Sequence, residues 1–327
     1  MKNVSIVGIG SYLPERVMTN ADLEKMVDTT DEWILTRTGI RERHIAADNE
    51  AASDLGAKAA LRALEDAHVS PEQVDMIICA TISKDMVFPN TACLIQNQIG
   101  ARNAFCFDME AACSGFLFAV ETARQYIVGG TVKTVLVVGA EKLSCFTDWQ
   151  DRSTCVLFGD GAGAVVLQSR ETGRGLIDTI MKSDGSLADL LCIPAGGSRQ
   201  PTTVKTIEER LHYMKMAGNQ VFKHAVRCMC DTSVELLSRN GLTISDMACV
   251  IPHQANMRIL QAIADKLGAK LEEKFYINLD RVGNISGASV PLALDDAVKC
   301  GRVKKGDLVL LVVFGGGFTW GATVLEL

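Results

Sequence analysis

The sequence lacks any stretch of apolar residues long enough to cross a membrane, and it lacks a recognisable export signal. No run approaches the roughly 18 to 20 apolar residues that span a bilayer. The first residues, MKNVSIVGIGSYLPE, contain neither a basic segment nor a long apolar one, so nothing resembles a signal peptide. We therefore expect a cytoplasmic protein without a membrane partner.

An excess of basic residues is also absent, and so is any cysteine pattern typical of zinc sites. The formal net charge is −6, whereas a nucleic-acid partner calls for a basic stripe. The eleven cysteines include no Cys-x-x-Cys pair, and the five histidines do not lie at zinc-ligand intervals beside them. We expect no metal, no disulfide framework and no nucleic-acid partner, and we expect most thiols to be buried as small hydrophobic groups.

What is present is a large apolar fraction and an internal repeat. Hydrophobic residues make up 48% of the 327 residues and charged residues only 22%, which suits two domains or one duplicated domain. One constant offset superposes the following pairs: Asp108 on Asp280, Ser114 on Ser286, Gly115 on Gly287, Gly129 on Gly301 and Lys133 on Lys305. Both copies then end alike, in GAVVL and GATVL, which indicates a duplication.

Apolar strands alternate with amphipathic helices in both copies, the second of which includes the expected strand KFYINLD. Strands that are apolar throughout imply sheets covered by helices on both faces. We therefore predict an α/β fold, a duplicated five-layer α/β/α/β/α sandwich, with one half at residues 1–172 and the other at residues 173–327. Cys113 and Asn284 then fall within one residue of equivalent positions, each just before a central helix, so we expect a site at the junction of the halves.

Cys113, in EAACSGF, is the candidate nucleophile. It stands between small residues where a helical pattern begins, and the unpaired N–H groups and dipole of a helix N-terminus favour a thiolate over a thiol. The alternative is one more buried thiol in a tightly packed turn.

Three further motifs carry candidate polar groups. His253, in IPHQAN, follows an apolar strand, at the sheet edge where α/β proteins place their sites. Asn284 lies in GNISGAS, and Gly316 lies in FGGGFTWG, where the backbone is free to approach a ligand. Each has a structural alternative: a hydrogen-bonded histidine, a helix-capping asparagine and a glycine turn.

Together these motifs make the sequence resemble the thiolase superfamily, and within it the β-ketoacyl-acyl carrier protein synthase III family of condensing enzymes. The matching stretches cover nearly the whole chain in the order GIGSYLPE, TNADLEKMVDTTDEWILTRTGIRERHI, AACSGF, LFGDGAGAVVL, PHQAN, NISGAS and FGGGFTWG. Related enzymes that elongate chains use two histidines with the cysteine, whereas Asn284 occupies the second position here.

The resemblance implies an acyltransferase that starts type II fatty acid synthesis. Cys113 would take an acyl group, with acetyl-CoA as the default primer, and the backbone N–H groups of Cys113 and Gly316 would stabilise the oxyanion. Malonyl-acyl carrier protein would then lose carbon dioxide, and His253 and Asn284 would donate hydrogen bonds to the enolate oxygen. No metal or redox cofactor is implied, because coenzyme A enters only as a thioester substrate.

The resemblance also assigns the substrate channel and the partners. The coenzyme A channel would be lined by Thr29, Trp33, Arg37, Arg152, Phe222 and Asn256. The acyl pocket would involve Leu117, Phe158 and, reaching over from the second subunit of a homodimer, Phe88. The acidic carrier protein would dock on Arg258, Lys223 and Lys266, which would steer the encounter.

Three alternatives remain open at this point. An enzyme of the same fold can prime a polyketide or secondary-metabolite pathway with the identical triad. A hydrolytic Cys-His-Asn enzyme shares the residue types, although the duplicated architecture and the absence of a glutamine directly upstream of Cys113, within the ten preceding residues, argue against it. A binding module without catalysis would not need all three residues. The segment AGGSRQPTTVKTIEERLHYMKM is longer than in some family members, and we expect it to form an exposed excursion near the coenzyme A entrance.

Overall fold

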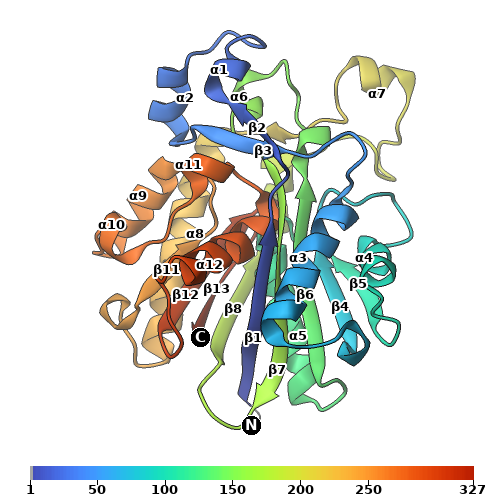
Figure 1. Ribbon diagram of the computed structural model, residues 1–327. Coiled ribbons are helices and arrows are strands. Elements are labelled where there is room, and N and C mark those ends of the chain that lie inside the picture. The colour runs from blue at the N-terminus through green and yellow to red at the C-terminus, as the bar shows by residue number, and fades with distance from the viewer. Residues whose placement is uncertain (1–2) are drawn as a thin grey trace.

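The computed structural model describes residues 3–327 and contains two main sheets with helices between and outside them (Figure 1). The first sheet has the strand order β1-β7-β6-β4-β5. β6, β4 and β5 run parallel, and β7 is antiparallel to both of its neighbours. The bounds of these strands are β1 Asn3–Tyr12, β4 Met76–Ala80, β5 Phe105–Met109, β6 Thr134–Lys142 and β7 Asp160–Arg170.

The second sheet repeats this plan with four strands in the order β11-β12-β13-β8. The bounds are β8 Leu176–Ser183, β11 Cys249–Pro252, β12 Leu308–Gly315 and β13 Thr319–Glu326. The strand predicted for KFYINLD is wrong: among residues 3–327, only one bridge, between Phe275 and Val250, extends the sheet on this side. The chain leaves the sheet edge after Tyr276, whose N–H donates to Val250 O, and turns into a short helix.

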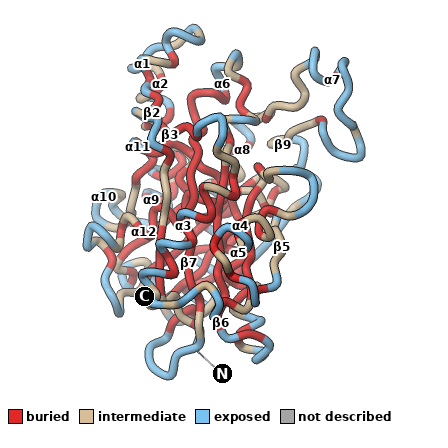
Figure 2. Tube along the Cα trace, turned by 45° about the vertical axis from the view of Figure 1, so that its right-hand side comes forward, coloured by how far each residue is buried: buried red, intermediate tan, exposed pale blue. Residues whose placement is uncertain are grey.

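Helices cover both sheets on both faces, which makes five layers. α3 and α4 pack on the outer face of the first sheet, α5 and α12 lie between the sheets, and α8 and α9 cover the outer face of the second. The bounds of these helices are α3 Ala52–Ala67, α4 Thr91–Ile99, α5 Gly115–Val128, α8 Gly218–Arg239, α9 Met257–Lys266 and α12 Ser289–Lys299. Figure 2 shows the buried chain, in red, concentrated in the strands and in the central helices.

The remaining helices, strands and 3-10 turns are short, and they lie in the connections between the larger elements. The helices are α1 Asn20–Leu23, α2 Asp31–Thr38, α6 Arg152–Cys155, α7 Val204–Glu208, α10 Leu271–Lys274 and α11 Leu279–Val282. The strands are β2 Arg16–Thr19, β3 Glu42–Ile45, β9 Leu191–Cys192 and β10 Lys215–Met216. The 3-10 turns are η1 Pro71–Gln73, η2 Ala112–Ser114, η3 Leu143–Cys145, η4 Gly185–Leu190, η5 Ile244–Asp246 and η6 Ser286–Ala288.

The two central helices begin with the same backbone turn. Ala112 has φ +47° and Ser286 has φ +43°, and these residues begin η2 and η6, which lead directly into α5 and α12. Cys113 therefore corresponds to Gly287, and the expectation that it falls within one residue of the equivalent of Asn284 is wrong. The two turns nevertheless contact each other, so the pseudo-twofold still brings Cys113 and Asn284 to one place.

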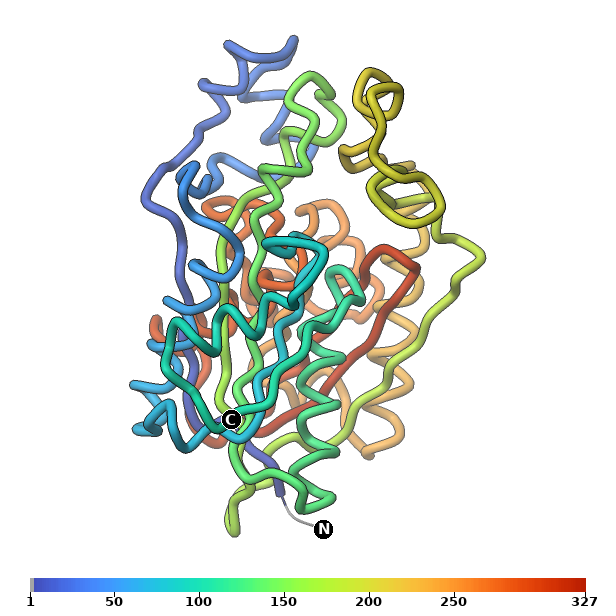
Figure 3. Tube along the Cα trace, turned by 90° about the vertical axis from the view of Figure 1, so that its right-hand side faces the viewer, coloured from blue at the N-terminus to red at the C-terminus, as the bar shows by residue number. Residues whose placement is uncertain are grey.

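The long segment after β9 projects from the end of the molecule that carries α1, α2 and α6. Figure 3 shows this yellow segment beside the green chain around residue 150. Asp148 accepts hydrogen bonds from Arg210, and Lys215 Nζ lies 3.6 Å from the same carboxylate. Val204 is 73% exposed on α7, in keeping with the expected excursion.

The predicted boundary between residues 172 and 173 lies in the connection between β7 and β8, which belong to different sheets. That the two halves are separate domains stays a prediction. No helix within residues 3–327 is both long enough and apolar enough to cross a membrane.

Candidate active site

Cys113 lies in the η2 turn, between the two halves of the molecule. Ser114 N–H donates to Ala111 O at 3.0 Å and closes the turn just before α5. The end of β12 presses on this turn so closely that a Cβ on Gly315 would lie 2.7 Å from Cys113 N. A larger residue than glycine would clash there, and Cys113 is 9% exposed.

Burial outweighs the helix N-terminus in setting the state of this thiol. The position of Cys113 at a helix N-terminus predicts a thiolate, but burial raises the pKa of Cys113 to about 12, with smaller opposing effects from the Ser286 hydroxyl and the Cys113 N–H. The resting sulfur is therefore a protonated thiol at neutral pH. A nearby base has to take its proton when the sulfur attacks.

His253 follows the carboxyl end of β11, as predicted for a residue at a sheet edge. Its backbone N–H donates to Val312 O at 2.8 Å, and the residue is 3% exposed. Burial lowers the pKa of the imidazole to about 4, and Nδ1 has no hydrogen-bond partner among the described residues. A neutral imidazole is therefore held in the site, ready to donate one hydrogen bond.

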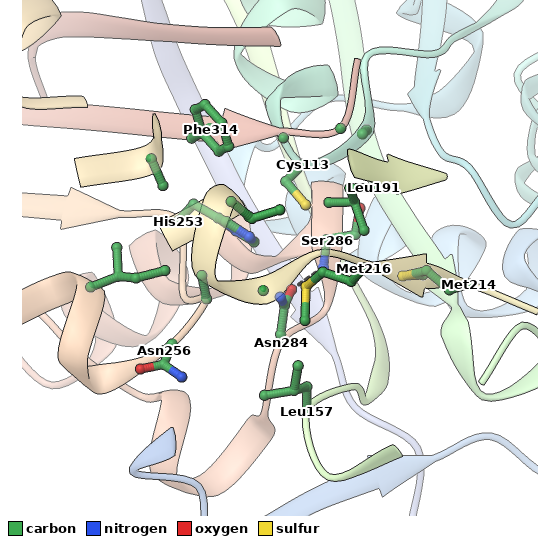
Figure 4. A pocket seen from close by; sticks show the side chains of 18 of the residues that line it. Cys113, Leu157, Leu191, Met214, Met216, His253, Asn256, Asn284, Ser286 and Phe314 are labelled. Carbon is green, nitrogen blue, oxygen red and sulfur yellow. Dashed lines mark hydrogen bonds between the residues drawn. The ribbon is translucent and has the colours of Figure 1, made fainter. Parts of the chain in front are cut away.

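Asn284 is fixed by the backbone on both sides. Its N–H donates to Leu157 O at 2.9 Å, and its carbonyl accepts from Gly159 N at 3.0 Å. Its side-chain Oδ1 accepts from Ser286 N at 2.9 Å, the dashed line in Figure 4. Because Oδ1 is used in this way, the Nδ2 group is left to donate toward the cavity.

One cavity joins these three residues. It has a volume of about 870 Å³ and is lined by Cys113, His253, Asn284 and Gly316. Figure 4 shows the Cys113 sulfur, the His253 ring and the Asn284 amide directed toward a common space. The cavity thus combines a nucleophile with two uncharged hydrogen-bond donors, an arrangement suited to acyl transfer through a thioester.

The residues predicted for coenzyme A divide into two groups. Four of the six line the cavity: Trp33, Arg37, Phe222 and Asn256. Arg152 lies outside the lining, with its Cζ 4.7 Å from the Trp33 ring centroid. Thr29, whose buried Oγ1 has no partner among the described residues, also lies outside the lining.

The predicted acyl-pocket residues are placed differently from one another. Phe158 lines the cavity. Leu117 is fully buried in the central core cluster and does not line it. Phe88 is 82% exposed on the loop before α4 and lies outside the cavity of its own chain, and its role in a second subunit stays a prediction.

The predicted docking residues lie on α8 and α9. Arg258 lines the cavity mouth, with its Cζ 5.9 Å from the Phe222 ring centroid. Lys223 and Lys266 are exposed and do not line the cavity.

Sequence reasoning missed part of the site. Cavity walls include Leu191 on β9 and, from the long segment, Met214 and Met216, and no motif marks them. Ser286 lines the cavity and Glu141 lies buried behind it. A single acidic residue near the end of the apolar run TVLVVGAEK was a signal that could have identified Glu141.

Comparison with known proteins gives one consistent family. A family model described as 3-Oxoacyl-[acyl-carrier-protein (ACP)] synthase III matches residues 107–185, and the model of its C-terminal part matches residues 237–327. The β-ketoacyl-acyl-carrier-protein synthase III of Desulfitobacterium hafniense is 52% identical over 326 residues, which cover 100% of this chain and 98% of the relative.

Solved structures agree with this match. The 3-oxoacyl-acyl-carrier-protein synthase III of Aquifex aeolicus is 47% identical, with a TM-score of 0.91 over 99% of this chain and 100% of that one. The priming β-ketosynthase of the R1128 polyketide pathway is 35% identical, with a TM-score of 0.93 over 100% of this chain and 96% of that one. The chain therefore belongs to the 3-oxoacyl-acyl-carrier-protein synthase III family of condensing enzymes with the thiolase fold.

Proposed function

We propose that this synthase joins an acyl-CoA primer, by default acetyl-CoA, to malonyl-acyl carrier protein through an acyl-Cys113 intermediate. The observation that carries the proposal is the single cavity that joins Cys113 to two uncharged donors, His253 and Asn284. Decarboxylative condensation requires this combination, because the sulfur holds the acyl group while the donors stabilise the enolate.

The first half-reaction forms a thioester on Cys113. Its sulfur attacks the carbonyl carbon of the acyl-CoA, the negative charge develops on the carbonyl oxygen, and coenzyme A leaves and takes up the proton that the Cys113 thiol releases. Backbone N–H groups of Cys113 and Gly316 are the proposed oxyanion donors, in line with the position of both residues on the cavity wall. One such donor contributes about 3 to 4 kcal/mol in an enclosed site.

The second half-reaction forms the carbon–carbon bond. Malonyl-acyl carrier protein loses carbon dioxide, and the resulting enolate carries its charge on the thioester oxygen. Neutral His253 and the Asn284 amide donate to that oxygen, which a carboxylate in either position would repel. The enolate carbon then attacks the acyl group, and Cys113 leaves as a thiolate.

The remaining predicted contacts concern delivery of the substrates. Trp33 and Arg152 would enclose the adenine of coenzyme A, and Arg258 at the mouth would meet the acidic carrier protein. Exposure of Phe88 supports a homodimer in which this ring enters the pocket of the second subunit. A cytoplasmic location, where both substrates occur, belongs to the same proposal.

Intact-protein mass spectrometry tests the proposal directly. Mixing with acetyl-CoA should add one acetyl group to the enzyme and none to Cys113→Ala, and malonyl-acyl carrier protein should then discharge it. Acetylation that persists in Cys113→Ala would overturn the assignment of the nucleophile. If no acetylation occurs, longer and branched acyl-CoA primers identify the pocket preference.

A second function is favoured by the likeness to the polyketide priming enzyme. A chase of the acylated enzyme with malonyl-CoA, in parallel with a chase by malonyl-acyl carrier protein, distinguishes fatty acid initiation from this second function. Discharge that requires the carrier protein supports fatty acid initiation, whereas discharge by malonyl-CoA alone supports a secondary-metabolite role.

A further inference from the structure

Arg43 is a fully buried arginine that the proposed mechanism leaves unused. It lies on β3 and is 0% exposed. No carboxylate within residues 3–327 forms a salt bridge with it, and its Nε has no hydrogen-bond partner among these residues. Burial lowers the pKa of the guanidinium to about 10, so the group is still charged at neutral pH. A buried charge without a counter-ion is costly, which points to a role that an apolar side chain could not fill.

The guanidinium of Arg43 binds two different segments of the chain. Nη1 donates to Asn20 Oδ1 at 2.9 Å and to Met18 O at 3.3 Å, where β2 leads into α1. Nη2 donates to Val156 O at 2.8 Å, directly after α6. A planar group with several fixed donors can hold both segments at once. Arg43 therefore ties the backbone at Val156 to β2 and α1.

The segment that Arg43 holds also holds Asn284. The next carbonyl along the chain, Leu157 O, accepts from Asn284 N at 2.9 Å, and Gly159 N donates to Asn284 O at 3.0 Å. Phe158 and Asn284 form a parallel bridge between these two hydrogen bonds. Figure 4 shows Leu157 and Asn284 next to each other at the cavity. One peptide unit therefore separates the carbonyl that Arg43 binds from the carbonyl that Asn284 binds.

The stem of Arg43 packs against both chains at this bridge. A Cβ on Gly159 would lie 3.1 Å from Arg43 Cβ, and a Cβ on Gly283 would lie 3.2 Å from it. Gly283 directly precedes Asn284 and has φ +70°, a conformation that favours glycine. Arg43 itself does not line the cavity. Any effect of Arg43 on the chemistry is therefore exerted through the residues that it supports.

We propose that Arg43 is a positioning residue that places the Asn284 amide for decarboxylation of the malonyl thioester. The inference rests on the two half-reactions proposed above. A donor that stabilises the enolate has to be held to within about 0.5 Å by the residues that support it. The enolate forms only in the second half-reaction, and acylation of Cys113 does not use the Asn284 amide. Loss of Arg43 should therefore slow condensation and spare acylation.

Arg43→Lys tests this separation, because it keeps the charge and most of the stem while one nitrogen replaces the fork. Discharge of acetyl-Cys113 by malonyl-acyl carrier protein should be about 100-fold slower than in the wild type. The acylation rate at saturating acetyl-CoA should stay close to the wild-type value. Rapid-quench mass spectrometry measures both rates. Discharge at the wild-type rate in Arg43→Lys would overturn the proposed role of the guanidinium.

Combination with Asn284→Ala distinguishes positioning from damage to the fold. If Arg43 acts through Asn284, its substitution has nothing left to misplace once the amide is gone. The double variant Arg43→Lys, Asn284→Ala should then discharge the acyl group at the rate of Asn284→Ala alone. Independent damage would instead multiply the two losses, and that result would overturn the positioning role.

A matched arginine and a count of active sites control for folding. Arg41→Gln changes an exposed arginine two residues earlier, whose backbone N–H donates to Asp280 O at 2.9 Å, and should keep both wild-type rates. The amplitude of acylation counts the folded active sites, so a misfolded fraction lowers the amplitude and leaves the rate constants unchanged.

A second variant keeps the test decisive if Arg43→Lys does not fold. Asn20→Ala retains the guanidinium and its hydrogen bond to Val156 O, but it removes the Nη1 acceptor at 2.9 Å. Discharge should again slow while acylation does not, and the loss should be smaller than in Arg43→Lys. Equal slowing of both half-reactions in Asn20→Ala would overturn the inference.

The positioning role and the proposed function fail in different ways. A wild-type enzyme that no acyl-CoA acylates would overturn the acyl-cysteine mechanism and the role of Arg43 with it. A wild-type enzyme that completes both half-reactions, beside Arg43 variants in which acylation slows as much as discharge, would overturn the positioning role alone.

Discussion

Arg152 stacks on Trp33 at the mouth of the cavity, with its Cζ 4.7 Å from the ring centroid. Arg152 Nη1 also donates to Asp28 O at 2.7 Å. The adenine of coenzyme A is predicted to bind between these two side chains, which already touch each other. Binding of the adenine therefore requires Arg152 to move away from Trp33. The contact between Arg152 and Trp33 is then replaced by two contacts, one from each side chain to the adenine.

Removal of this stacking surface should weaken binding of coenzyme A without slowing the chemistry. Trp33→Ala should raise KM for the acyl-CoA about tenfold and leave kcat close to the wild-type value, because stacking of a base on an aromatic ring contributes about 1 to 3 kcal/mol. Steady-state kinetics with saturating malonyl-acyl carrier protein measures both constants. An acyl thioester of N-acetylcysteamine, which lacks adenine, is the control, and an equal rise in its KM would refute this placement of the base.

The two half-reactions should separate in variants of the enolate donors. His253→Ala should still form acyl-Cys113 with acetyl-CoA, since this step does not need the enolate site. Its discharge by malonyl-acyl carrier protein should be about 100- to 1,000-fold slower, the usual cost of losing one oxyanion donor. Rapid-quench mass spectrometry follows both steps. Acylation that slows as much as discharge would instead assign His253 to the first half-reaction.

Buried His253 should make the fold sensitive to acid. Its pKa is about 4 in the folded chain and 6.5 in the reference state, so between these values the unfolded state binds a proton that the folded state does not. Stability is therefore complete above pH 6.5 and falls as the pH drops toward 4, by about 3 kcal/mol in total.

Urea unfolding between pH 4.5 and 7 measures this effect. The variant His253→Gln should lose less stability on acidification than the wild type. Glu141→Gln offers a contrast of opposite sign, because the raised pKa of Glu141 makes the folded wild type lose stability as the pH rises from 4.5 to 7. Parallel curves for wild type and His253→Gln would contradict the prediction.

The layers of the fold were accessible from the sequence because apolar periodicity is a local property. Strands such as MIICA in β4 are buried at every position, so an uninterrupted run of apolar residues is enough to predict a strand with both faces covered. The failed strand KFYINLD shows the limit. It also reads as apolar and aromatic, yet only Phe275 forms a bridge, because pairing depends on where the following helix directs the chain.

The sequence predicted which residues form the site better than it predicted the protonation state of Cys113. The motifs around Cys113, His253 and Asn284 pointed to one cavity, and all three residues line it. The protonation state of the thiol could not be derived from its helix position, since its burial depends on segments distant in the sequence, such as the strand end at Gly315 that packs on the Cys113 turn. Glu141 was missed for the same reason: only the fold brings it next to η6.

The ion pairs of Asp148 should hold the long segment against the cavity entrance. Asp148 is 4% exposed and lies with Arg210 and Lys215, and the hydrogen bond from Arg210 is the main cause that lowers the pKa of Asp148 to about 2. Asp148→Asn removes the charge that both cations share. Limited proteolysis should then cleave residues 196–210 several-fold faster, and KM for the acyl-CoA should rise because Met214 lines the cavity.

A matched variant separates this anchor from ordinary surface charge. Lys205 and Glu209 also form an ion pair in this segment, at 3.7 Å, but their side chains are 81% and 48% exposed. Exposed pairs of this kind contribute little, so Lys205→Ala should leave both the cleavage rate and KM unchanged. Equal cleavage rates for the two variants would mean that packing of the segment on the cavity wall, rather than Asp148, holds it in place.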